Sequence, residues 1–224
     1  MAAEAPKRAK KTRAEKSIEN RNSILEAAAE IVGELGYAEA SIARITQRAG
    51  LAQGTFYLYF ESRQALFDEL LPHMGQGLLD FLHSRVEGAT DMLDVEERGF
   101  RGFFDYLQRN PSFFRVLNEA EVAAPRAYEE HFDKLRKRYV DSLERSWARG
   151  QLAGYALEEM EVLAYILMAA RSYLYLRYSK DESGPKPIPD WVVNAFVKFI
   201  SGGLLYRPVA TSDHRCDKKD ASSS

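Results

Sequence analysis

The sequence predicts an all-α protein with two helical domains. Apolar residues recur at helical spacing, as at Ile24, Leu25, Ala28 and Leu35, and similar patterns follow along most of the chain. We find no segment with the alternating apolar and polar residues of a half-buried strand. Glycine and proline residues separate the helical segments. The 224 residues suffice for one or two domains with a sizeable core.

Composition excludes several classes of protein. The chain is 46% hydrophobic and 29% charged, which is ordinary for a soluble globular protein. Its longest uncharged apolar run, 162–170, is far shorter than the roughly 20 residues that span a bilayer. The N-terminus lacks the apolar core of a signal peptide, and the single Cys216 cannot form a disulfide framework. We therefore expect a cytoplasmic protein with no membrane segment.

The two ends of the chain differ from its body. Residues 1–21 contain seven Lys or Arg against three Glu, whereas the rest carries a net charge of −6. We expect 1–16 to be a disordered basic arm, because it has no apolar face to bury. Such an arm is attracted to a polyanion, or it is only a solubilising tail. Residues 207–224 also read as a disordered tail.

The N-terminal helices are bounded by local signals. The first helix ends at Gly36, Ser41 caps a second, Gly50 ends it, and a third begins near Ala52 or Gln53. Segment 41–60 thus reads as helix, tight turn, helix, the arrangement that places its second helix in the DNA major groove.

Further helices are expected after residue 60. They cover about 62–85 with a bend at Pro72, 92–109, 111–123, a long segment after Pro125, 157–179 and 191–205. The four histidines are scattered, and neither GxSxG nor a phosphate-binding loop occurs. We expect no enzyme activity, no catalytic residue, no metal site and no cofactor.

The segment SIARITQRAGLAQGTFYLYFESRQALF resembles the DNA-binding domain of TetR-family transcriptional regulators, and the resemblance covers about 20–70. It implies a helix-turn-helix DNA-binding domain at 17–65 and a helical effector-binding and dimerisation domain at 66–206. It departs from the family at Ala52, where a Ser or Thr often caps the recognition helix. The DNA-binding residues that it implies are Ser41, Arg44, Thr46, Gln53, Gly54, Thr55, Tyr57, Tyr59 and Arg63.

The aromatic residues of this segment divide between two faces. Phe56 and Phe60 are expected to point into the core, while Gln53, Thr55, Tyr57 and Tyr59 face outward. Gln53 can bond base edges, adenine best, and Gly54 lets the backbone approach the DNA closely. The other residues mostly position phosphates, and Thr46, which replaces a frequent Ala, is expected to face DNA.

The C-terminal part is rich in aromatic residues, since 95–180 hold 15 of the chain's 26. They form a packed core, or they line a ligand pocket together with a few polar groups. The candidate pocket residues are Phe103, Phe104, Phe114, Asn118, Glu121, Tyr128, Phe132, Arg171 and Tyr175. Their chemistry favours an apolar or amphipathic effector. Arg171 interrupts an apolar run and needs a partner, which we expect to be Glu161 or a carboxylate across a dimer interface, or else an anionic ligand.

Together these features predict a homodimeric, ligand-responsive repressor that binds a palindromic double-stranded DNA operator. By resemblance, the last two helices form the dimer interface. The alternative is a ligand-independent, nucleoid-associated or structural DNA-binding protein on the same scaffold. A cavity within 95–180 would favour the regulator.

Overall fold

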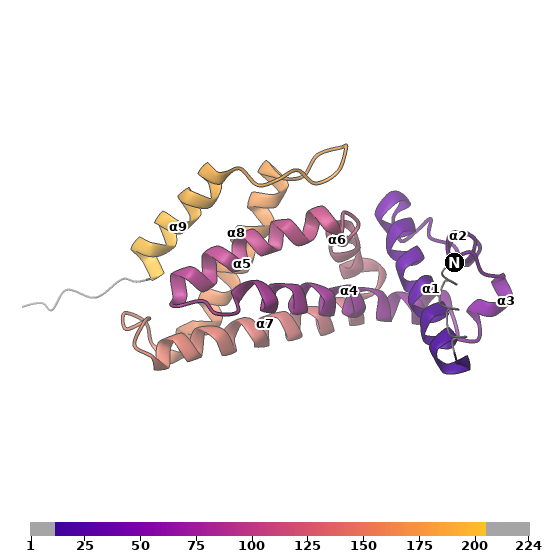
Figure 1. Ribbon diagram of the computed structural model, residues 1–224, viewed down its shortest axis with the longest axis horizontal. Helices are drawn as coiled ribbons and strands as arrows, with labels where there is room; N and C mark the ends of the chain where they lie inside the picture. Colours follow the sequence, from indigo (N-terminus) through magenta and orange to yellow (C-terminus); the bar gives the residue numbers. More distant parts are fainter. Residues whose placement is uncertain (1–11, 205–224) are drawn as a thin grey trace, which may run out of the picture.

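The computed structural model describes residues 12–204, which form nine α-helices and one short 3-10 helix (Figure 1). No strand occurs within this range, as the sequence predicts. Helices α1 (Arg13–Leu35), α2 (Ile42–Arg48) and α3 (Gln53–Phe56) form a small domain at one end. None of the helices in the described part is long and apolar enough to cross a membrane.

Helix α1 begins earlier than the sequence analysis expected. The Thr12 hydroxyl accepts a hydrogen bond from the Glu15 amide, and the Glu15 carboxylate accepts one from the Thr12 amide. This capping box satisfies two amides at the start of the helix, so residues 13–16 are helical rather than part of a disordered arm. Residues 1–11, with the rest of the predicted arm, and the predicted tail at 207–224 lie outside the described residues.

The turn between α2 and α3 follows the predicted local signals. The Ser41 hydroxyl accepts from the Arg44 amide at 3.3 Å and caps α2. Gly50 has a φ of 67°, a left-handed conformation that glycine adopts without steric cost. Ala52 gives α3 no side-chain cap, which is the departure noted in the sequence.

The larger domain is built around α4 (Arg63–Val86), which runs from the small domain along the length of the molecule (Figure 1). The other helices are α5 (Met92–Arg109), α6 (Phe113–Ala123), α7 (Pro125–Ala148), α8 (Met160–Tyr178) and α9 (Asp190–Leu204). Helices α7 and α5 pack against α4, α8 packs against α7, and α9 packs against α5.

Two helix starts differ from the expected ones. Helix α6 begins at Phe113 rather than at Pro111, because Pro111 and Ser112 form a turn. The segment expected as one helix from 157 begins with a 3-10 turn, Leu157–Glu159, before α8. In that turn the Glu159 carboxylate accepts a hydrogen bond from the Ala156 amide at 2.7 Å. Tightened turns of this kind are frequent at helix ends.

Candidate DNA-binding surface and effector cavity

The outer face of α3 and the residues after it form a candidate DNA-binding surface. Phe56 and Phe60 are buried, as predicted from their spacing. Gln53, Gly54 and Tyr57 are exposed on the other side. Leu58 is also exposed, at 77%, and the sequence analysis missed it. Leu58 lies midway between Phe56 and Phe60, which both point inward, and this position in a helical repeat predicts an outward side chain.

Thr46 does not face DNA, which corrects the sequence-based expectation. Its side chain is buried, and its hydroxyl donates to the backbone carbonyl of Ile42 at 2.9 Å. A threonine inside a helix can satisfy its hydroxyl on the preceding turn in this way, so it can be buried at little cost.

Two further residues of the set are less exposed than expected. Tyr59 is half-buried against the core, and its hydroxyl accepts a hydrogen bond from Asn20 Nδ2 of α1 at 3.2 Å. Its ring therefore packs toward α1 rather than outward. Thr55 is half-buried as well.

The polar residues at the edges of this surface are partly engaged within the protein. Arg44 Nη1 lies 2.8 Å from the Glu39 carboxylate, which offsets its charge. Ser41 is half-buried at the start of α2. Arg63 is exposed, with its guanidinium 5.4 Å from the centre of the Phe67 ring. The set contains two arginines. Arg44 is paired with a carboxylate, whereas Arg63 has no carboxylate partner among the described residues.

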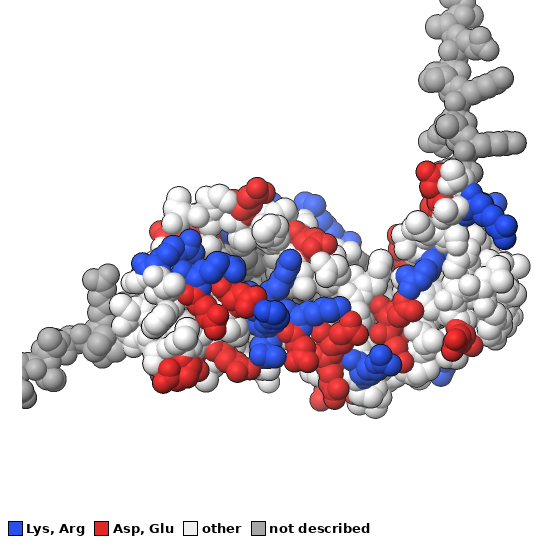
Figure 2. Space-filling model, turned by 90° about the horizontal axis from the view of Figure 1, so that it is seen from below, with Lys and Arg blue, Asp and Glu red and all other residues white. Residues whose placement is uncertain are grey.

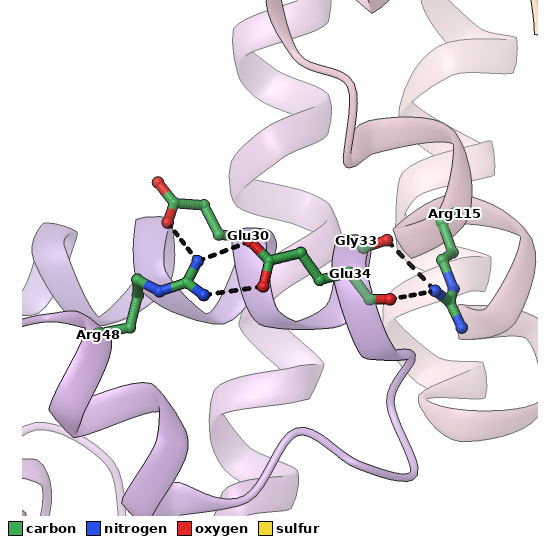
Figure 3. A network of polar contacts seen from close by, with 5 residues as sticks. All are labelled: Glu30, Gly33, Glu34, Arg48 and Arg115. Carbon is green, nitrogen blue, oxygen red and sulfur yellow. Dashed lines mark hydrogen bonds and ion pairs between the residues drawn. The ribbon is translucent and has the colours of Figure 1, made fainter. Parts of the chain in front are cut away.

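The C-terminus of α1 is held by α6 of the larger domain (Figure 3). Arg115 Nη1 donates to the backbone carbonyls of Gly33 and Glu34 at 3.3 and 2.8 Å. Carbonyls in the last turn of a helix have no partner within the helix, so Arg115 acts as a cap from another domain. On the other side of Glu34, Arg48 of α2 bonds the carboxylates of Glu30 and Glu34.

Glu119 of α6 strengthens the same joint. Its carboxylate accepts from the Tyr37 amide at 2.9 Å and from Arg115 Nε at 2.6 Å. Although partial burial opposes ionisation, these hydrogen bonds hold the pKa of Glu119 below its usual value. The pair Arg115 and Glu119 therefore links α6 to the chain just before the helix-turn-helix.

A cavity of about 710 Å³ lies in the larger domain, with walls from α4, α5, α6, α7 and α8. This volume lies within the usual range for a small-molecule site, about 300–1,000 Å³. Of the nine candidate pocket residues, Phe103, Phe132 and Arg171 line it.

The other six candidates do not line the cavity. Three of them, Phe104, Phe114 and Tyr175, are buried in the packed core, where the Phe114 and Tyr175 rings lie 4.2 Å apart. Tyr128 packs beside Phe132. The last two, Asn118 and Glu121, are exposed on α6. An aromatic residue on a helix faces a cavity only if its neighbours leave space there, which helical spacing does not reveal.

Arg171 has a buried partner in its own chain, Glu96 of α5. The two charged groups lie 2.7 Å apart, and both residues are buried. Neither Glu161 nor a carboxylate across an interface is required, since Glu161 lies on the surface and pairs with Arg136. Glu96 was not predicted from the sequence, because its spacing resembles that of a solvated surface carboxylate.

Tyr139 of α7 completes this buried network. Its hydroxyl donates to the Glu96 carboxylate, with oxygen–oxygen distances of 2.8 and 2.7 Å. Burial raises the pKa of Tyr139 well above its usual value, which keeps the hydroxyl protonated as a donor. Arg171 Nη1 also donates to the Leu167 carbonyl.

His131 of α7 is a further buried polar residue in the cavity wall, apart from the network of Glu96 and Arg171. It is 2% exposed, and its Nε2 has no hydrogen-bond partner among the described residues. Burial, followed by the Lys134 charge, lowers the pKa of His131 to about 4, so the ring is neutral at neutral pH. His131 has no other histidine at a ligand spacing, so no sequence pattern marks it as a residue of the cavity.

Helices α8 and α9 expose many large apolar side chains. Those on α8 are Val162, Tyr165, Ile166, Tyr173 and Leu176, and those on α9 are Trp191 and Phe199. The five on α8 share one face of the helix by their spacing, and an exposed apolar patch usually marks an interface.

Residues 24–70 match the family model described as "Bacterial regulatory proteins, tetR family". This segment contains α2, α3 and the turn between them. The DNA-binding segment is therefore of the TetR type.

TetR-family relatives match either the N-terminal part or most of the chain. An uncharacterized HTH-type transcriptional regulator, YvdT of Bacillus subtilis, is 43% identical over 72 residues, which cover 32% of this chain and only 37% of that protein. The HTH-type transcriptional activator FasR of Mycolicibacterium smegmatis is 24% identical over 207 residues, 87% of each chain. These relatives are transcription regulators, in agreement with the expectation that the chain is not an enzyme.

The likeness to solved structures extends over both domains. The structure of the fatty acid degradation regulator FadR from Bacillus halodurans superimposes with a TM-score of 0.67 at 20% identity, covering 89% of this chain and all of that one. Within 12–204, no three metal-ligating side chains gather as a metal site would require.

Proposed function

We propose that the protein is a cytoplasmic, DNA-binding transcription regulator that acts as a homodimer and responds to a small apolar or amphipathic molecule. The observation that carries this proposal is the cavity of about 710 Å³ in a domain joined by α6 to the helix-turn-helix. A ligand-independent, nucleoid-associated protein would need no such space, so the cavity favours the regulator.

DNA binding rests on the exposed face around α3. Gln53 would read base edges in the major groove, Gly54 would allow close approach, and Tyr57 would contact the backbone. Arg63 would contribute a phosphate contact at the edge. The expected roles of Ser41, Arg44 and Thr55 are secondary, because these side chains are partly engaged or half-buried.

Dimerisation rests on the exposed apolar face of α8 and α9. A two-fold dimer would present two α3 helices to a palindromic operator, with half-sites about 34–36 Å apart or a multiple of this. Repression is the effect that we propose for such binding at a promoter.

The response to a ligand would pass through α6. Phe113 and Leu117 of this helix line the cavity, while Arg115 and Glu119 hold the end of α1. A ligand that binds better to one position of α6 would therefore favour one position of the DNA-binding domain. The coupling of about 1–3 kcal/mol that is typical of allostery would change operator affinity roughly 5–150-fold.

The chemistry of the cavity walls suggests an acyl compound. The leucine and aromatic walls suit a hydrocarbon chain, and one structural neighbour is described as a fatty acid degradation regulator. Both considerations support an effector with an acyl or other elongated apolar body.

Three measurements test the proposal: DNA selection, operator affinity with added ligand, and a reporter assay. Selection from a random double-stranded DNA pool should enrich a palindromic sequence, and added medium-chain carboxylates should change the affinity for it. A reporter driven by a promoter with that sequence would show repression. If no sequence were enriched, specific regulation would be contradicted. If no apolar probe changed the affinity for DNA, the nucleoid-associated alternative would be favoured.

A further inference from the structure

The polar groups that α7 contributes to the cavity wall lie in three places. Tyr139, bonded to Glu96 of α5 and beside Arg171 of α8, forms the first, and His131 forms the second. A row of Arg138, Asp141, Ser142 and Arg145 forms the third. These places differ in whether the protein already satisfies the polar groups. That difference indicates which parts of a ligand each can bind.

The buried network of Glu96, Arg171 and Tyr139 has little left to offer a ligand. Arg171 donates to Glu96 and to the Leu167 carbonyl, and its charge is balanced by the carboxylate. A buried ion pair with its hydrogen bonds made does not call for a further charge. An anionic ligand group therefore has no reason to bind there.

His131 is different, because its buried Nε2 lacks a partner among the described residues. A buried polar atom without a partner costs free energy, so a ligand atom that bonds it is favoured. The ring is held against Gly75 of α4, where even an added Cβ would lie 2.1 Å from His131 Nδ1, so it is fixed in place. Because the neutral ring brings no charge, the matching ligand group is an uncharged hydroxyl or carbonyl.

The third place carries positive charge. Arg138 and Arg145 are exposed, line the cavity and have no carboxylate partner among the described residues. The nearby Asp141 is paired with Lys137 at 3.3 Å. Lys, Arg, Asp and Glu side chains are intermixed on the face along which α7 lies (Figure 2). Arg138 lies seven residues beyond His131, about 10 Å along the helix axis.

We propose that the cavity binds an elongated apolar molecule in one orientation, with an anionic group at Arg138 and Arg145 and an uncharged hydroxyl or carbonyl at His131. The inference rests on the proposed effector cavity and specifies its ligand. His131 then determines which chains are accepted, because a chain ending in a methyl group leaves Nε2 unpaired.

The test compares two carboxylates that differ only at the far end, ω-hydroxydecanoate and undecanoate, by calorimetric titration of the full chain. Wild-type protein should bind the hydroxylated probe roughly 5–150-fold more tightly, the range that corresponds to one buried hydrogen bond left unmade. His131→Phe should abolish or invert this preference. His131→Gln, which keeps hydrogen-bonding groups, should retain part of it, and His83→Phe, at the other cavity-lining histidine, should retain all of it.

The proposed anion site at Arg138 and Arg145 is tested with a neutral analogue of the probes, decanediol. The double change Arg138→Gln with Arg145→Gln should weaken the binding of both carboxylates by about tenfold or less, because only an exposed charge interaction is lost. The affinity for decanediol should not change. Arg136→Gln is the matched control, since Arg136 pairs with Glu161 and does not line the cavity.

The outcomes separate this inference from the proposed function. Equal binding of the two carboxylates, unaffected by His131→Phe, would overturn the ligand orientation while leaving the effector cavity intact. Failure of every probe, decanediol included, to bind wild-type protein would overturn both. If His131→Phe does not fold, as judged by circular dichroism, loss of the preference in folded His131→Leu would serve instead, and its retention would count against the inference.

Discussion

Arg171 Nη2 lies 2.7 Å from Glu96 Oε2, and the two side chains are 8% and 3% exposed. The pair joins α8 to α5, and Tyr139 ties both to α7. It thereby fixes three of the helices that surround the cavity. Desolvation of the two charges offsets much of their attraction, so the pair matters most when one partner is lost.

Glu96→Leu should therefore lower the free energy of unfolding by about 3–5 kcal/mol, because it leaves Arg171 charged and unpaired in the core. The double change Glu96→Leu with Arg171→Leu should cost less than the two single changes added together. Urea unfolding at fixed protein concentration measures all four proteins. Arg136→Leu, which breaks the exposed pair with Glu161, should cost about 1 kcal/mol or less. Additive single changes would show that the pair is not coupled.

Stability should depend on pH through His131. Its pKa is about 4 in the folded protein and about 6.5 when unfolded, so only the unfolded chain takes up the proton between these values. Stability is therefore fully present above about pH 6.5 and falls as the pH drops toward 4. Between pH 7 and pH 5 the free energy of unfolding should fall by about 2 kcal/mol.

His131→Phe should remove that part of the pH dependence. The measurement is urea unfolding of both proteins at pH 7 and pH 5, with exposed His83→Phe as the control. An undiminished slope in His131→Phe would mean that His131 does not carry the effect.

Gly33→Ala should loosen the joint between the domains. A Cβ at this position would lie 2.2 Å from Ser112 Oγ and 2.9 Å from the Ser112 Cα, so α6 would have to move away from α1. Overpacking costs about 1–3 kcal/mol and outweighs the roughly 1 kcal/mol that alanine gains in a helix. Thermal unfolding and operator titration should show lower stability and an altered effect of ligand on DNA affinity. Gly99→Ala, whose Cβ would meet nothing closer than 3.8 Å, should be neutral or stabilising.

Substitutions on the helix-turn-helix should separate base reading from phosphate contact. Gln53→Ala should relax base preference by about 1–3 kcal/mol, whereas Arg63→Ala should weaken all sequences alike and lower the salt slope by about one. Binding titrations on operator and scrambled DNA at several salt concentrations distinguish the two. Thr46→Val should leave DNA preference unchanged, because its buried hydroxyl bonds Ile42 of its own helix. If the Gln53→Ala protein still discriminated fully between operator and scrambled DNA, Gln53 would not be the residue that reads the bases.

The proposed dimer interface is best tested at Tyr173 and Phe199, which are 74% and 73% exposed. Aspartate at both positions should give monomers that bind DNA poorly with α3 unchanged, as judged by sedimentation and gel shift. Phe196 is unsuitable for this purpose, because it is buried and stacks on Phe100 at 4.1 Å. Val122→Asp, on the exposed surface of α6, is the control. A doubly substituted protein that stays dimeric would place the interface elsewhere.

The sequence alone determined the order of the helices and the helix, turn, helix pattern of 41–60. Caps such as Ser41 and glycines such as Gly36 and Gly50 act on neighbouring residues, so their effects can be read from a short segment. The inward direction of Phe56 and Phe60 follows from a spacing of four residues on a helix. The family resemblance rested on the same local pattern.

The tertiary structure decided what each helix face meets. Glu96 and Arg171 are 75 residues apart, and no local pattern announces that their side chains are buried together. His131 is deprived of a partner only because α4 and α7 close around it, and Thr46 is buried only because α2 packs on α1. Helical periodicity marks an apolar face but does not tell a packed neighbour from a cavity, because that depends on side chains from distant parts of the chain.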